Sequence, residues 1–197
     1  MQLGLIDEFT HSTVRIESIL PDGSVSTGSG FFMNFHKTEG RWIPVIVTNK
    51  HVVSNAVSGR FYITPTNVDG LPDYGQHYLF QIEDFEKECI KHPNPNVDLV
   101  AYPIAKLISK VKEHGRSLFY VPLNMDLIPT DEERNSFSSM EDVMMIGYPN
   151  GIWDQANNLP VIRKGITATH PSINWNGNPE FLTDIASFPG SSGSPVF

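Results

Sequence analysis

A serine flanked by glycines ends the chain, and its neighbours have the pattern that a nucleophile needs. In the final stretch "GSSGSPVF", Gly190 stands two positions before Ser192, and Gly193 directly follows it. The first glycine lets the backbone aim its own N–H and that of Ser192 at one point, and the second permits close approach by a substrate. Acyl transfer by a serine needs such donors, together with a base and a group that orients the base. Composition alone favours a flexible Gly/Ser tail, so the rest of the chain decides.

A histidine and an aspartate stand at the ends of apolar segments, where they could serve as base and orienter. In "VIVTNKHVVSNA" an apolar strand is predicted to end at Thr48, which places His51 just beyond it and before a short helical turn. In "HPNPNVDLVAYPI", Asp98 stands at the start of another apolar strand. Taken singly, each position favours a structural role: a packed or capping histidine and a turn-forming aspartate.

The order of these residues along the chain favours one catalytic arrangement. His51, Asp98 and Ser192 follow the His, Asp, Ser order of chymotrypsin-type enzymes. In an α/β-hydrolase the nucleophile lies in a G-x-S-x-G elbow, and the acid and then the histidine follow it in the chain. Here Ser194 stands where the last glycine belongs, and no histidine follows Ser192. The α/β-hydrolase arrangement is therefore excluded. We therefore expect Ser192 to attack, His51 to act as base and Asp98 to orient the histidine. This triad implies no metal and no organic cofactor.

The elements that must position these residues are mostly short strands. Apolar and β-branched stretches alternate with turn signals, which is typical of an all-β barrel or sandwich. The stretches are "STVRIES", "STGSGFFM", "RWIPVIVT", "RFYITP", "DLVAYPI", "DVMMIGYP", "LPVIRKGITAT" and "EFLTDIAS". Only "HVVSNAV" and "IAKLISKVKEHG" suggest helices. The polar region 64–97 is predicted to form loops around one or two edge strands.

Bulk composition narrows the classes of partner. Acidic residues outnumber basic ones by 22 to 14, for a net charge of −8, so a nucleic-acid partner is not expected. The longest apolar run, "WIPVIV", is too short to span a bilayer, and the first 20 residues lack the apolar core of a signal peptide. Cys89 is the single cysteine, which excludes an internal disulfide and favours a cytoplasmic location.

Several motifs together resemble one enzyme family from about residue 12 to the end of the chain. The stretches "TNKHVV", "GYPNG" and "GSSGSPVF" are similar to the bacterial glutamyl-endopeptidase branch of the trypsin-like, chymotrypsin-fold serine peptidases. The stretches "TGSGFFM", "VDLVAY" and "TDIASFPGSSGSP" are similar to the Htr-type branch of the same family.

The resemblance implies a chymotrypsin-like double β-barrel. Residues 1–105 would form the first barrel with His51 and Asp98, residues 106–118 a connector, and residues 119–197 a second barrel with Ser192. The backbone N–H groups of Gly190 and Ser192 would form the oxyanion hole. The substrates would be proteins or peptides, and the active site would lie between the barrels.

The chain also departs from parts of the family. The digestive members carry an acidic residue before the nucleophile that pairs with a newly cut N-terminus, whereas Ser191 stands there. We therefore do not expect activation of that kind. Ala186 occupies the position at the base of the primary specificity pocket, where an aspartate would select Lys or Arg, so trypsin-like cleavage is disfavoured.

The end of the chain leaves two functions open. A second barrel needs strands beyond "SPVF", so we expect it to be incomplete in this chain and the natural protein to be longer. The leading hypothesis is a serine endopeptidase that works through an acyl-enzyme. The alternative is a catalytically dormant protease-fold binding module, or a regulated effector domain with a C-terminal sensor or regulatory region beyond Phe197.

Overall fold

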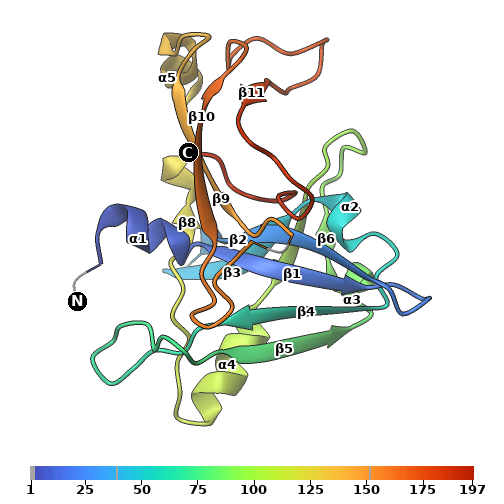
Figure 1. The fold of residues 1–197 in the computed structure, drawn as a ribbon, viewed down its shortest axis with the longest axis vertical. Helices are drawn as coiled ribbons and strands as arrows, with labels where there is room; N and C mark the ends of the chain where they lie inside the picture. Colours follow the sequence, from blue (N-terminus) through green and yellow to red (C-terminus); the bar gives the residue numbers. More distant parts are fainter. Residues whose placement is uncertain (1–2, 39, 151) are drawn as a thin grey trace.

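The computed structural model describes residues 3–38, 40–150 and 152–197, which form two β-sheets (Figure 1). The first sheet has the strand order β5-β4-β1-β2-β3-β7-β6, with β8 pairing in parallel to β2, and the second has the order β11-β10-β9. The bounds of the strands are β1 (Thr13–Ile19), β2 (Val25–Thr38), β3 (Arg41–Thr48), β4 (Ser58–Ile63), β5 (Tyr78–Glu83), β6 (Ile90–Lys91), β7 (Val100–Pro103), β8 (Leu123–Asn124), β9 (Asp142–Gly147), β10 (Val161–Thr167) and β11 (Thr183–Asp184). The prediction of an all-β protein is confirmed.

The first sheet is built largely from neighbours in sequence, as its turn signals suggest. The stretch "PDGS" closes the hairpin between β1 and β2, and Gly23 there has a φ of 83°, a left-handed conformation that glycine adopts at little cost. The region 64–97 supplies β5 and β6 between its loops, as predicted. In Figure 1 the strands β9 and β10 rise steeply from the first sheet, and the C-terminal segment, in red, turns back down toward it.

The main hydrophobic core lies inside the curved first sheet. Alternating residues of β1 and β4 point inward, as the period-2 pattern of strands requires, whereas residues 45–48 of β3 are all buried and Ile46 among them lies in this core. Its fully buried members include Ile16, Ile46, Phe61, Phe85 and Ile104. At about 25 cal/mol per Å² of buried apolar surface, such side chains contribute most of the favourable free energy of folding, which the loss of chain entropy opposes.

Helices are short and lie between strands. The two predicted helices are present as α2 (Lys50–Val53) and α4 (Ala105–Glu113), which Figure 1 shows at the right and at the bottom of the view. Four further helical segments were not predicted from the sequence: α1 (Leu5–Thr10), α3 (Phe85–Glu88), the 3-10 turn η1 (Met125–Leu127) and α5 (Asp131–Ser136). No helix in the described part of the chain is both long and apolar enough to cross a membrane.

The boundary between the two predicted units stays a prediction. The helix α4 occupies most of the expected connector, and β9 to β11 follow it as a separate sheet. The short strand β8, which also follows α4, pairs with β2 through Met33 opposite Leu123. The chain after the connector thus first adds to the first sheet and then begins the second.

A buried histidine packs where α1 meets β1. His11 is 6% exposed, its Nε2 lies 3.1 Å from the hydroxyl of Tyr74, and the ring of Phe119 lies edge-on at a centroid distance of 4.9 Å. Burial lowers the pKa of His11 from 6.5 to about 4, although Asp7 opposes part of this shift. The folded protein therefore resists protonating this ring.

This histidine makes stability depend on pH. Between pH 6.5 and about 4 the unfolded chain protonates His11 while the folded chain does not, so the free energy of unfolding decreases as the pH is lowered through this window. The loss should reach about 2 to 3 kcal/mol at the acidic end. His11→Gln, which cannot be protonated, should show a shallower fall in denaturant titrations across the window. Parallel pH profiles for the two proteins would contradict the prediction.

Candidate active site

The register of two neighbouring strands brings His51 and Asp98 together. In the antiparallel pair of β3 and β7, Thr48 lies opposite Val100. The chain enters α2 just after Thr48, and Asp98 stands two residues before Val100, so both side chains emerge at the same end of the strand pair. Although 47 residues separate them in sequence, the sheet makes them neighbours.

The carboxylate of Asp98 holds the histidine through both of its oxygens. Its Oδ1 accepts the backbone N–H of His51 at 3.1 Å, and its Oδ2 lies 2.5 Å from Nδ1 of the ring. An ionised carboxylate can only accept, so Nδ1 carries the proton and Nε2 presents its lone pair outward. The side chain of Asn49 adds a hydrogen bond to the backbone carbonyl of Asp98 at 2.7 Å. The two side chains are 59% and 47% exposed, so a substrate could reach the ring.

The turn that carries Ser192 rests on the same end of the first sheet. The backbone N–H of Ser29 donates to the carbonyl of Ser192 at 2.8 Å. Gly193 has a φ of 84°, and a Cβ there would lie 2.0 Å from the carbonyl oxygen of Ser29 and 2.5 Å from Oγ1 of Thr48. Only glycine fits this contact. Thr48 is three residues before His51, so the turn lies against the strand end that leads into the histidine.

Ser29, in the middle of β2, is the polar junction of the site. Its hydroxyl is fully buried, donates to the carbonyl of Gly190 at 2.9 Å and accepts the N–H of Tyr148 at 2.8 Å. Its own carbonyl accepts the hydroxyl of Thr48 at 2.7 Å. One residue therefore connects β2, the end of β3, the segment after β9 and the turn before Ser192.

The N–H groups of Gly190 and Ser192 donate to no acceptor among the described residues. Gly190 has a φ of 89°, and a Cβ there would lie 2.7 Å from the carbonyl of Tyr148. The preceding carbonyl, that of Pro189, accepts the N–H of Asn150 at 2.7 Å, which fixes the peptide plane and turns the N–H of Gly190 away from Asn150. Two unpaired backbone donors thus lie within one turn, as an oxyanion site requires.

Not every predicted partner is in contact. Within the described residues, no hydrogen bond joins the hydroxyl of Ser192 to the ring of His51. Ser192 is partly exposed. Such bonds are often long without substrate and tighten only in the reactive complex. Ala186 is exposed, and its carbonyl accepts a hydrogen bond from Arg163 at 2.9 Å.

Ser29 and Arg163 were not predicted from the sequence as parts of this site. Ser29 lies in "TGSGFFM", but its partners Tyr148 and Gly190 are 119 and 161 residues away in sequence. Arg163 reaches Ser191 from 28 residues away. No local pattern marks either residue, because the position of a serine or an arginine along a strand indicates only which face of the sheet its side chain occupies.

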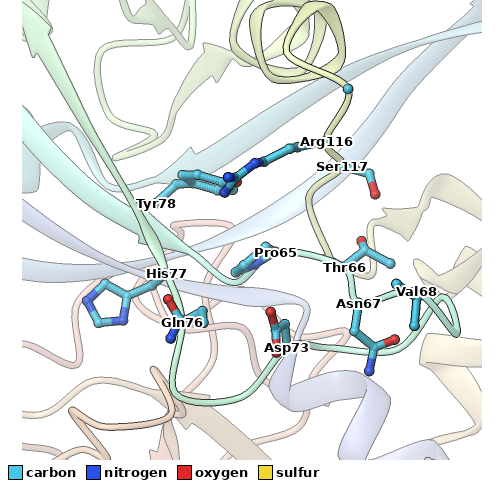
Figure 2. A pocket seen from close by; sticks show the side chains of 11 residues that line it. Pro65, Thr66, Asn67, Val68, Asp73, Gln76, His77, Tyr78, Arg116 and Ser117 are labelled. Carbon is cyan, nitrogen blue, oxygen red and sulfur yellow. The ribbon is translucent and has the colours of Figure 1, made fainter.

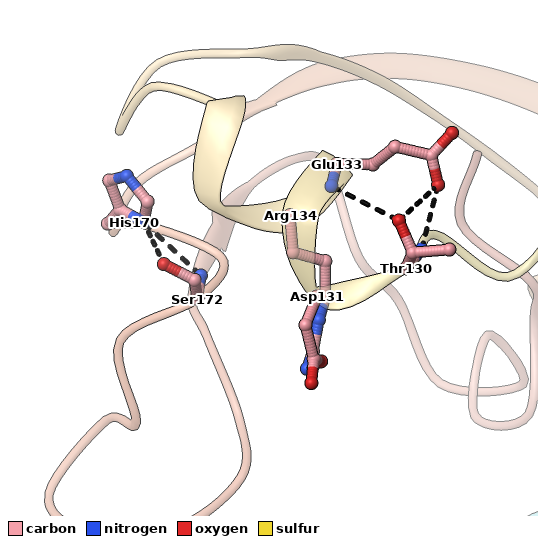
Figure 3. Close-up of polar contacts among 6 residues, drawn as sticks. All are labelled: Thr130, Asp131, Glu133, Arg134, His170 and Ser172. Carbon is pink, nitrogen blue, oxygen red and sulfur yellow. Dashed lines mark hydrogen bonds and ion pairs between the residues drawn. The ribbon is translucent and has the colours of Figure 1, made fainter.

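A second contact between a serine and a histidine is a local turn and not a rival site. The hydroxyl of Ser172 lies 2.9 Å from Nδ1 of His170, and the N–H of Ser172 lies 3.2 Å from the same atom (Figure 3). The two residues are two positions apart, so this is a side-chain turn of the kind found in loops. Across the described residues no carboxylate is bonded to His170, unlike His51.

The pocket in Figure 2 lies away from the candidate active site. It has a volume of about 570 Å³. Pro65, which lines it, follows the end of β4, whereas α2 precedes the start of β4, so the pocket and α2 lie at different ends of this strand. Arg116 lies over the ring of Tyr78 there and donates to its hydroxyl at 2.7 Å. None of the residues predicted from the sequence lines it. Within residues 3–38, 40–150 and 152–197, no cluster of His, Cys, Asp or Glu could hold a metal ion.

One solved structure supports the fold. The HtrA-type protease AlgW, solved with a tripeptide, is 17% identical with a TM-score of 0.52, over 97% of this chain and 48% of that one. The active form of the Rv3671c protease from M. tuberculosis is 18% identical with a TM-score of 0.49, over 97% of this chain and 66% of that one. The chain therefore spans half to two thirds of the length of these proteases. The likeness to AlgW confirms the prediction of a chymotrypsin-like fold.

The sequence itself carries the family assignment. No curated protein matches the chain. The profile of the trypsin-like peptidase domain, however, matches residues 28–197, which run from the β2 segment around Ser29 through His51 and Asp98 to the turn of Ser192. This match covers most of the chain, and the chain belongs to the trypsin-like peptidase domain family.

Proposed function

We propose that this chain is a serine endopeptidase with a triad of His51, Asp98 and Ser192. The observation that carries the proposal is the pair of hydrogen bonds that Asp98 accepts from the backbone N–H and the ring of His51. It fixes the tautomer that a general base needs, beside the strand end on which the Ser192 turn rests. Membership of the trypsin-like peptidase family supports peptide bonds as the substrate class.

The proposed reaction has two stages. Nε2 of His51 takes the proton of the Ser192 hydroxyl while the serine oxygen attacks the scissile carbonyl, and the same proton then passes to the leaving amine. Asp98 stabilises the imidazolium that forms between these transfers. In the second stage water loses a proton to His51 and attacks the acyl-enzyme, and His51 then returns this proton to the serine oxygen as the acid product leaves.

The proposed oxyanion hole consists of the N–H groups of Gly190 and Ser192. Neither has an acceptor within the described part of the chain, and the carbonyls of Pro189 and Gly190 are held by Asn150 and Ser29. Donors fixed in advance stabilise the oxyanion without reorganisation during the reaction. We further propose that Ala186 lies at the base of the primary specificity pocket, where its methyl group provides no charge to select Lys or Arg.

A dormant protease-fold module is the second candidate. The observation that favours it is the missing hydrogen bond between Ser192 and His51. A fluorophosphonate probe distinguishes the candidates, because it reacts with a serine only when a base activates the hydroxyl.

Removing the proposed nucleophile should abolish turnover. Ser192→Ala should lose fluorophosphonate labelling and reduce peptide hydrolysis on the order of 10⁶-fold in the chemical step. Ser172→Ala, which removes the other serine bonded to a histidine, is the matched control and should label like the parent protein. Labelling of Ser192→Ala at the parent rate would refute the assignment.

Changing the orienting carboxylate should also reduce turnover strongly. Asp98→Asn keeps the shape, but its amide can stabilise the wrong tautomer of His51, so kcat should fall by about 10⁴-fold. Asp84→Asn is a suitable control, because Asp84 is exposed and has a φ of 51°, which asparagine tolerates. Steady-state kinetics on a peptide substrate measures both, and equal kcat values in the two variants would remove Asp98 from the triad.

The Ser29 junction should affect stability and turnover together. Ser29→Ala leaves the N–H of Tyr148 and the carbonyl of Gly190 without partners, so the free energy of unfolding should fall by about 1 to 3 kcal/mol. The labelling rate at Ser192 should fall as well. Ser26→Ala, an exposed serine on the same strand, should change neither quantity. If both variants unfold at the same denaturant concentration, the junction does not stabilise the fold.

A further inference from the structure

Arg163 reaches from β10 to the turn that precedes the proposed nucleophile. A single nitrogen, Nη1, lies 2.9 Å from the carbonyl oxygen of Ala186 and 2.9 Å from the hydroxyl oxygen of Ser191. Both acceptors belong to the segment 186–191, at its first and last residues. The guanidinium therefore bridges the two ends of this segment.

Ser191 completes the closure from inside the segment. It is 5% exposed, its hydroxyl oxygen also accepts the N–H of Phe188 at 3.3 Å, and its own N–H donates to the carbonyl of Phe188 at 3.0 Å. The next residue is Ser192, and Gly190 lies within the closed segment. Any movement of Ser191 would therefore redirect both proposed oxyanion donors.

The arginine is costly where it stands. Its Nε and Nη2 are buried without a hydrogen-bond partner, and no carboxylate of the described residues pairs with it. Burial lowers the pKa of the guanidinium, although the group remains charged near neutral pH. An apolar side chain of similar length would avoid the desolvation of an unpaired charge. The two bonds from Nη1 are the compensation that the structure offers.

We infer that Arg163 is a positioning residue that orders the segment 186–191 and so keeps the N–H groups of Gly190 and Ser192 aimed at the oxyanion. The catalytic part of this inference rests on the proposed function. Because β10 of the same chain supplies the cation, the turn is ordered without a cut at the N-terminus. The neutral Ser191 is the matching partner, since it accepts from Arg163 and from Phe188 at once.

The bonding pattern predicts which substitution is tolerated. Both bonds come from one nitrogen, so the planar fork of arginine is not used and the ammonium of lysine can replace it. Arg163→Lys should keep kcat within about threefold of the parent, whereas Arg163→Met should lower kcat about 10-fold to 100-fold, as expected for a displacement of catalytic groups by a fraction of an ångström. The KM should stay near the parent value in Arg163→Lys and rise in Arg163→Met, because the lost bond to the carbonyl of Ala186 also loosens the base of the proposed specificity pocket.

A double-mutant cycle tests the path through Ser191. Ser191→Ala should lower kcat in the parent protein but have a much smaller effect in Arg163→Met, because the shorter of the two bonds that it removes, the one to Arg163, is already absent there. Independent, additive losses would overturn the inference. Equal kcat values in Arg163→Met and Arg163→Lys would overturn it too.

Amide hydrogen exchange gives a readout that needs no turnover. The N–H groups of Ser191 and Ser194 donate to Phe188 and Ser191, so their exchange reports the order of the turn. Exchange should accelerate about 10-fold or more in Arg163→Met and stay near the parent rate in Arg163→Lys. Unchanged exchange in Arg163→Met would overturn the anchoring role. If the parent protein is not labelled by fluorophosphonate, the proposed function fails while exchange still decides the anchoring.

Discussion

The buried hydroxyl of Ser29 is the contact on which the rest of the site depends. It donates to Gly190 in the turn before the proposed nucleophile and accepts from Tyr148 at the end of β9, so it joins the two sheets at one point. A hydrogen bond of this kind contributes about 1 kcal/mol net, but an unsatisfied buried partner costs more than that. The arrangement around Ser29 is therefore maintained mainly because breaking either hydrogen bond would leave a buried polar group without a partner.

The charged groups of the site differ in their degree of burial. The side chains of Asp98 and His51 are about half exposed, and a hydrogen-bonded pair in such a setting contributes little to stability. Their double contact is best understood as orientation of the ring. Arg163 is the opposite case, since two of its nitrogens are cut off from water without partners. Its cost in stability is tolerable only where the order that it imposes has a use.

Glycines mark the places where the two sheets come closest. Gly193 lies against Ser29 and Thr48, and a Cβ at Gly147 would lie 1.9 Å from the hydroxyl of Ser194. The nucleophile turn and the end of β9 therefore approach with no room for a side chain. This close approach places backbone groups, and not flexible side chains, around the proposed oxyanion position. Backbone donors need no rearrangement during the reaction.

Much of this architecture could be predicted from the sequence. The strands, the helices α2 and α4, and the order of His51, Asp98 and Ser192 all follow from local patterns, because alternation along a strand and turn residues are properties of neighbouring positions. The helix α5 was missed although Thr130 and Glu133 form a capping box that the sequence "TDEE" encodes. The two-residue strand β8 was missed because its parallel pairing to β2 depends on a distant partner.

By itself, the sequence determined the fold class, the candidate triad and the glycines around the nucleophile. Only the tertiary structure decided that Ser29 holds the turn and that Arg163 closes it. The reason is physical: a strand pattern specifies which face a side chain occupies, but not which polar atom will lie opposite it when two sheets pack. The partners of Ser29 are 119 and 161 residues away, and only the packed sheets bring them within hydrogen-bond distance.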